Sequence, residues 1–184
     1  MKKTYDDKSW SFLIASPAFC GAIFEESVVL LLEDGADGSL GVVINSPLEK
    51  TLGEIDESFL KYPTLSQVEV FDGGPVSKNR ISIAVWTDSE GGVNDFSFGL
   101  TADKAEKMLK SNPDAKAAAF IGYAGWDANQ LNREIAEGTW LTMPADLEFI
   151  SQFDPFELWE ELLFIQNPIY EKLPEPPDAP ENNN

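Results

Sequence analysis

The sequence predicts a single α+β domain whose sheet is mixed and mostly antiparallel. Segments typical of strands and of helices are mixed along the chain, and several neighbouring strand-like segments are close enough to form hairpins. The chain has 184 residues, 43% of them hydrophobic, which suits one domain whose core needs no disulfide or metal. We assign residues 10–172 to this domain, residues 1–9 to a flexible N-terminus and residues 173–184 to a disordered acidic tail rich in proline and asparagine.

Seven segments predict β-strands because they are apolar or alternating and are bounded by turn residues. They are residues 10–15, 27–33, 39–45, 68–71, 80–87, 96–98 and 116–123. Between the second and third strands, residues 34–38 have the composition of a hairpin loop, and the spacing of their aspartates does not fit a calcium-binding loop. Residues 88–95 are polar and contain glycine, so they predict a loop.

Four segments predict helices: residues 52–60, 101–109 and 126–136, and a last helix that starts at Asp154. Thr101 has a side-chain oxygen that can accept from the free amides of a first turn, and Gly138 follows the third helix where a stop is expected. The last helix opens with an acceptor, a proline and a glutamate. Its apolar residues suit packing either on the core or on another chain, which leaves the oligomeric state open.

The net charge of −19 bears on the partners of this protein. Direct contact with DNA or RNA is not expected, because such affinity depends on lysine and arginine at the phosphates and only thirteen basic residues are present. An anionic membrane surface would be repelled as well, and no apolar run approaches the roughly 18 residues of a membrane span. The lone Cys20 fits a cytoplasmic location.

The residues offer few means of catalysis. Histidine is absent and Cys20 is the only cysteine, which removes histidine-based nucleophile systems and thiolate metal clusters. The glycine patterns of phosphate-binding and dinucleotide-binding loops are absent too. We therefore expect no cofactor and no metal, with one alternative: a carboxylate enzyme that uses a divalent metal, because aspartate and glutamate are plentiful.

Three stretches carry a resemblance to a known family. They are residues 11–17 with Phe24, 27–28 and 41–47; residues 73–76 with Arg80; and residues 122–126 with 130–131, 134–135, 140–141 and 144–146. In this order and spacing they resemble the AlgH/YqgE family of bacterial proteins over roughly residues 10–150. The resemblance implies one α+β domain with a bifurcated, barrel-containing sheet flanked by helices, and a transcriptional regulator.

Resemblance and charge together predict a non-catalytic binding or regulatory protein. It would act on transcription indirectly, through a protein or a small-molecule partner. A regulator that binds DNA directly ranks last, because the basic residues are few and scattered. Eight residues are candidates for contact with the partner: Asn45, Gly73, Gly74, Arg80, Gly122, Gly125, Trp126 and Gln130.

Each candidate also has a purely structural interpretation. The strand at 116–123 is expected to run into a turn of small residues at 122–125, just before a helix; this turn can present amides to an anion, or simply let strand and helix pack closely, which is favoured. Trp126, Gln130 and Glu134 repeat every four residues and would share a helical face, on which Glu134 is expected to be solvated. For Arg80 an internal ion pair is favoured over a ligand contact, and for Asn45 a ligand contact and a turn role are equally supported.

Overall fold

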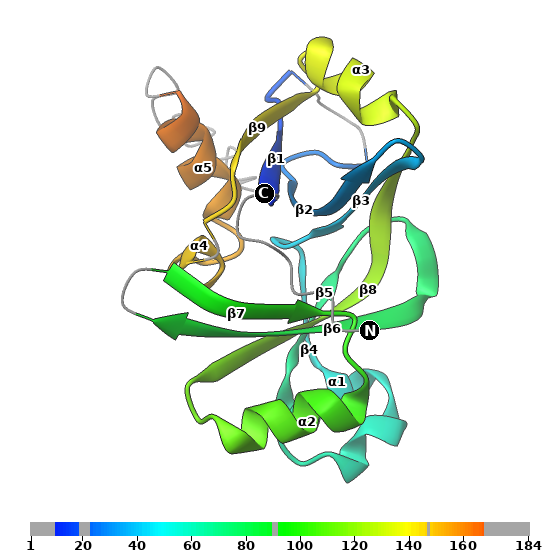
Figure 1. The fold of residues 1–184 in the computed structure, drawn as a ribbon, viewed down its shortest axis with the longest axis vertical. Helices are drawn as coiled ribbons and strands as arrows, with labels where there is room; N and C mark the ends of the chain where they lie inside the picture. Colours follow the sequence, from blue (N-terminus) through cyan, green and yellow to red (C-terminus); the bar gives the residue numbers. More distant parts are fainter. Residues whose placement is uncertain (1–9, 19–22, 90–91, 147, 168–184) are drawn as a thin grey trace, which may run out of the picture.

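The computed structural model describes residues 10–18, 23–89, 92–146 and 148–167 (Figure 1). The predicted flexible N-terminus, the predicted tail and Cys20 lie outside the described residues. The strands are β1 (Ser11–Ala15), β2 (Val28–Gly35), β3 (Gly38–Val43), β4 (Pro47–Thr51), β5 (Glu69–Asp72), β6 (Val76–Ser89), β7 (Gly92–Phe98), β8 (Ala115–Asp127) and β9 (Trp140–Pro144). The helices are α1 (Leu52–Ile55), α2 (Ala102–Ser111), α3 (Gln130–Ala136), α4 (Glu148–Gln152) and α5 (Leu158–Gln166), with 3-10 turns η1 (Glu57–Lys61) and η2 (Leu65–Gln67). No described helix is long and apolar enough to cross a bilayer.

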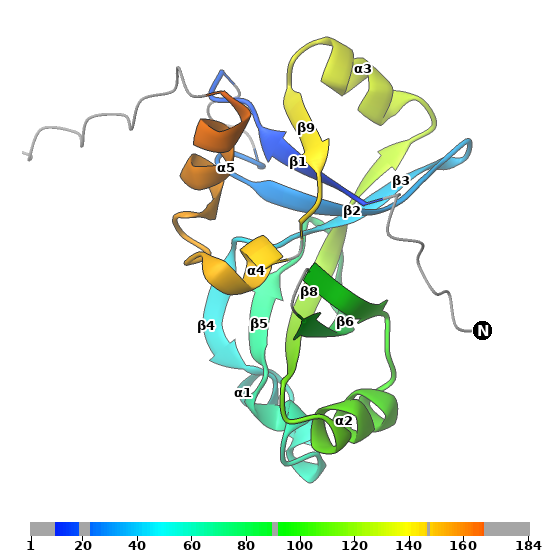
Figure 2. The ribbon, with the colours of Figure 1, turned by 60° about the vertical axis from the view of Figure 1, so that its left-hand side comes forward.

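The described strands form one nine-stranded sheet that forks along β8. The first part of β8 pairs with β5 in parallel and with β6 in antiparallel orientation, and residues 124–127 pair with β3. The strand thus joins the lower part of the molecule to the upper part (Figure 2). This confirms the α+β class and the bifurcated, mostly antiparallel sheet. The pairings among the described strands do not close into a ring, so the barrel-like part is not a closed barrel.

At the fork, β8, the segment after β5 and the end of β3 come close together, and glycines make this close approach possible. Gly122 has a φ of 72°, and a Cβ there would lie 2.4 Å from the carbonyl oxygen of Gly74. The Gly73 amide donates to the Ile121 carbonyl, and the Gly73 carbonyl accepts from the Val43 amide. A side chain at Gly122 would therefore separate β8 from the segment that follows β5.

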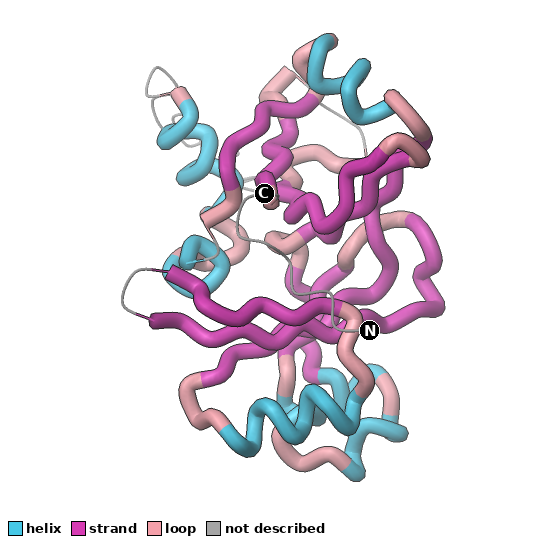
Figure 3. The backbone as a smooth tube through the Cα atoms, in the orientation of Figure 1, coloured by secondary structure: helices cyan, strands magenta, loops and turns pink. Residues whose placement is uncertain are grey.

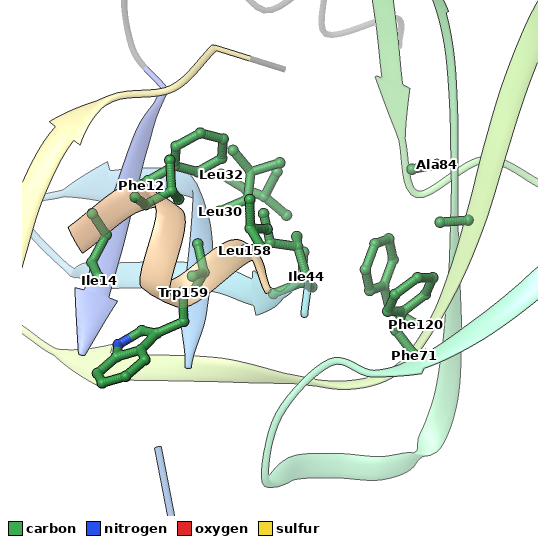
Figure 4. Close-up of a cluster of buried hydrophobic side chains, with 14 of the residues drawn as sticks. Phe12, Ile14, Leu30, Leu32, Ile44, Phe71, Ala84, Phe120, Leu158 and Trp159 are labelled. Carbon is green, nitrogen blue, oxygen red and sulfur yellow. The ribbon is translucent and has the colours of Figure 1, made fainter. Parts of the chain in front are cut away.

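Three apolar clusters hold the sheet and helices together. One lies between the two parts of the sheet and is closed by α5, a second lies under α3, and the third packs between the lower sheet and α2. Figure 4 shows Leu158 and Trp159 of α5 beside Phe12 and Leu30 in the first cluster. The indole Nε1 of Trp159 donates to the carbonyl of Ala15 at 2.9 Å. The apolar face of the last helix therefore packs on the core.

The predicted strands and the hairpin are confirmed. Gly35 pairs with Gly38, so two residues form the turn between β2 and β3. Strand β4 and helix α4 were not predicted from the sequence, whereas β9 contains Trp140, which the sequence places in an extended segment after the third helix. Figure 3 shows how much of the described chain is strand, including the long hairpin of β6 and β7.

Two loop or turn predictions are wrong because strands run further than their apolar residues. Residues 88–95 were expected to be a loop, yet β6 and β7 pair through Thr87 with Asp95 and Asp88 with Val93. Backbone ladders do not require apolar side chains, so polar composition was a poor guide there. Residues 122–125 were expected to be a turn, yet they belong to β8, and the helix starts at Gln130.

Two helix predictions are partly wrong at their ends. The predicted helix at 52–60 is split into α1 and η1, since the Asp56 carboxylate accepts from the Ser58 amide and starts a second turn. Helix α5 begins at Leu158, because a turn at residues 155–157 comes first, with the Asp154 side chain accepting from the Phe156 amide. Phe156 consequently points away from the core and is 67% exposed.

Candidate functional site

Two of the eight candidate residues, Asn45 and Gly74, lie along one groove. It consists of two adjoining pockets of about 280 and 170 Å³ that share Ile23, Ser27 and Ser46 as lining residues. Asn45 lines the larger pocket and Gly74 the smaller one. The turn before β2, the end of β3, the segment after β5 and the start of α5 contribute its walls. We call it the Ile23 groove.

The turn at residues 23–26 forms one wall and is held firmly. The ring of Phe24 stacks on Trp126 with ring centroids 6.4 Å apart and meets Trp140 edge-on at 5.5 Å. Asn45 holds the other side, since its Oδ1 accepts from the Val28 amide at 2.7 Å and its Nδ2 donates to the Glu26 carbonyl at 2.9 Å. The Asn45 side chain is thus a clamp on the backbone, and Ile23 is left 79% exposed.

The opposite wall comes from the turn before α5 and from the first turn of that helix. Phe156 and Glu160 line the larger pocket together with Trp159, which is buried. Glu25 and Glu26 line the same pocket, so three exposed carboxylates surround it. At the far end of the groove Lys78 pairs with Asp72, whose Oδ1 also accepts from the Gly74 amide.

Three other candidates, Gly125, Trp126 and Gln130, line a shallow depression of about 510 Å³ beside the β2–β3 hairpin. Gly125 and Tyr123 alternate along β8 and contribute to its floor. Glu33, Asp37 and Asp127 give it an acidic edge.

The carboxylate of Glu134 organises the residues behind this depression. The indole Nε1 atoms of Trp126 and Trp140 both donate to its Oε2, each at 2.8 Å. Gln130 Nε2 donates to Oε1 at 2.8 Å, and Gln130 Oε1 accepts from the Asp127 amide at 3.0 Å. The expectation that Glu134 is a solvated surface residue is wrong, because the indole N–H groups of two buried tryptophans, one on β8 and one on β9, both need an acceptor there. Trp126 lies on β8 and not on a helical face with Gln130.

The remaining candidates do not line these surfaces. Gly73 and Gly122 are buried at the fork of the sheet, where they serve close backbone packing. Arg80 is exposed on β6, and the described residues give it no ion pair, so the favoured internal pair is not found. In the described chain, no three acidic, cysteine or histidine side chains gather closely enough to hold a metal ion.

Ile23 and Phe156 were not identified as site residues from the sequence. An exposed isoleucine and an exposed phenylalanine read as core residues in a linear sequence, and Phe156 was predicted to be part of the apolar face of its helix. A signal for Glu134 was present, since it lies between two tryptophans that need acceptors.

Comparison with known proteins identifies relatives over most of the chain. The AlgH-like family matches residues 12–170. A UPF0301 protein of Thioalkalivibrio sulfidiphilus is 32% identical over 81% of this chain and 84% of its own length, and one of Chlamydia muridarum is 36% identical over 83% of each. The solution structure of the AlgH protein from Pseudomonas aeruginosa superposes with a TM-score of 0.65 at 26% identity, covering 90% of both chains. The crystal structure of protein DIP2367 from Corynebacterium diphtheriae shares the fold, with a TM-score of 0.67 at 20% identity over 84% of this chain and 85% of that chain.

Proposed function

The chain belongs to the AlgH-like family, and we propose that it is a cytoplasmic, non-catalytic binding protein that engages a protein partner through the Ile23 groove. Through that partner it would influence transcription without touching DNA. The net charge of −19 supports this indirect route, because it disfavours contact with phosphates.

One observation carries the proposal: two large apolar side chains are exposed on the lining of a single pocket. Ile23 is 79% exposed and Phe156 is 67% exposed, and they come from segments at opposite ends of the chain. Single exposed apolar side chains are ordinary, but neighbouring ones around a hollow are typical of interaction sites. Aromatic and aliphatic anchors at the centre of an interface commonly provide most of its binding energy.

Two polar side chains of the groove, Asn45 and Lys78, are already engaged within the protein, which supports binding over catalysis by these two groups. Both atoms of the Asn45 amide are engaged by the backbone, and Lys78 is engaged by Asp72. A general acid, general base or nucleophile must instead be within reach of a substrate proton or reacting atom. These side chains shape the groove and hold its walls in place.

Site-specific photo-crosslinking in cells that produce the protein tests this function. A benzoylphenylalanine at position 156 should give a discrete adduct with a partner protein, and the substitution Ile23→Ser should abolish that adduct. The matched control is a benzoylphenylalanine at position 60, since Leu60 is 59% exposed but lies in η1, away from the groove. Adducts from position 156 that are no more abundant than those from position 60, or that persist in Ile23→Ser, would rule out the groove as the binding site.

A further inference from the structure

We propose that the partner segment that enters the Ile23 groove is a cationic peptide stretch, with a lysine or arginine next to an apolar residue. This inference rests on the proposed function, because it assigns a chemical class to the occupant of the same groove. It follows from the distribution of charge around the two pockets.

The larger pocket attracts positive charge. Glu25, Glu26 and Glu160 line it and are exposed, and none of the three forms an ion pair among the described residues. The described lining of this pocket includes no lysine or arginine. The overall charge of −19 adds a long-range field that speeds encounters with a positive partner.

The apolar side chains of the same pocket suit the rest of a basic side chain. Lysine and arginine carry apolar stems that pack along hydrophobic surface while the charged head stays in polar surroundings. Ile23 and Phe156 provide such surface next to the carboxylates. A guanidinium group gains further from the face of an aromatic ring, which favours arginine.

The smaller pocket suits an apolar neighbour of that basic residue. Phe24, Val43 and Pro75 line it, and its one lysine, Lys78, is already paired with Asp72. The two pockets share lining residues, so one extended segment can occupy both. The groove therefore has a direction, with the cation among the glutamates and the apolar anchor toward Pro75.

Charge argues against the other occupants. In a symmetric contact between two copies of this chain, the same surface patch is used by both subunits. Glu25, Glu26 and Glu160 of one copy would then lie in the same interface as the three carboxylates of the other, which places six like charges together. Nucleic acid and anionic lipid are repelled for the same reason.

Binding of defined peptides to the full-length protein tests the inference by fluorescence anisotropy. The probes are three short fluorescein-labelled peptides that share one leucine and one phenylalanine and carry zero, two or four arginines. We expect affinity to rise with the number of arginines and to fall as salt is added. The triple variant E25Q/E26Q/E160Q should bind the four-arginine peptide on the order of tenfold more weakly.

A matched variant separates the groove from the general negative field. E57Q/E69Q/E137Q removes three negative charges from exposed positions that do not line the groove, and it should bind within about twofold of the unchanged protein. Equal weakening by both triple variants would overturn the inference. If Ile23→Ser weakens all three peptides but E25Q/E26Q/E160Q has no effect, the groove binds proteins and only its preference for cations is wrong. If Ile23→Ser has no effect on any peptide, the proposed function fails together with the inference.

Discussion

Replacing Glu134 with alanine should destabilise the protein, because this carboxylate is the shared acceptor of two buried tryptophans. Trp126 and Trp140 are 6% and 2% exposed, and both indole N–H groups donate to Glu134 Oε2 at 2.8 Å. Water has little access to either group, so both lose their acceptor when the carboxylate is removed. The amide of Gln130, which is less buried, can exchange its bond to Glu134 for a bond to water.

The size of the effect follows from the cost of an unsatisfied buried donor. Each such group costs about 1–3 kcal/mol, so two of them cost about 2–6 kcal/mol, and we take about 3 kcal/mol, in the lower half of this range, as the expected loss in the free energy of unfolding. For a domain of this length the melting temperature should fall by roughly 6–12 °C. Glu134→Gln keeps one carbonyl oxygen as an acceptor, so it should lose less stability than Glu134→Ala.

Thermal and urea unfolding, followed by circular dichroism and tryptophan fluorescence, measure this loss. Glu137→Ala is the matched control, because Glu137 is exposed at the end of the same helix and carries the same charge. It should change the free energy of unfolding by no more than about 0.5 kcal/mol. A Glu134→Ala protein as stable as Glu137→Ala would refute the argument that the carboxylate satisfies the two indoles.

Three further substitutions probe the fork, the buried carboxylate of α2 and the groove wall. Gly122→Ala should lower the free energy of unfolding in urea by more than about 3 kcal/mol, on the order of the largest single-site effects, because its Cβ would clash with backbone atoms. Gly99→Ala is the control: Gly99 has a similar φ of 71° but open space around it, so this substitution should show only the cost of φ strain. Burial raises the pKa of Glu106, yet hydrogen bonds from Lys110 and two backbone amides outweigh it and hold the pKa below its ordinary 4.5. The ionised Glu106 carboxylate therefore stabilises the folded protein above pH 4.5, and this stabilisation is lost as pH falls through the lower pKa of the folded state. The melting temperature of Glu106→Gln should consequently change less between acid and neutral pH than that of the unchanged protein. Asn45→Ala removes both clamp bonds and should cost about 1–3 kcal/mol in urea unfolding, with faster amide hydrogen exchange in the turn before β2.

Local pattern predicted the elements of this fold well. The strand at β2, the hairpin turn and the strand at β3 follow from apolar runs on either side of a glycine-rich turn. The same logic failed at residues 122–125, where the glycines allow a close crossing of backbones inside a strand. Local sequence cannot distinguish a turn from a place where two backbone segments lie in close contact. Here the requirement for glycine at position 122 comes from the carbonyl oxygen of Gly74, which is distant in the chain.

The candidate site was predictable only in part, for the same reason. Asn45 and Gly74 do lie at the groove, but Asn45 acts as a clamp on the backbone. Exposure of Ile23 depends on the neighbouring Phe24 being the residue that turns inward between Trp126 and Trp140. Which of the two side chains turns inward therefore depends on tryptophans that lie about a hundred positions later in the chain.

The two tryptophans that donate to Glu134 also support the Ile23 groove. Loss of Glu134 should therefore affect both the stability of the protein and peptide binding in the groove. Phe24 rests against both Trp126 and Trp140, and it belongs to the turn that presents Ile23. Glu134 does not line the described parts of the groove. We therefore expect Glu134→Ala to weaken arginine-rich peptides severalfold well below its melting temperature, because the bound conformation of the turn becomes less populated. Unchanged peptide affinity in a folded but less stable Glu134→Ala protein would mean that the Asn45 clamp alone fixes the turn.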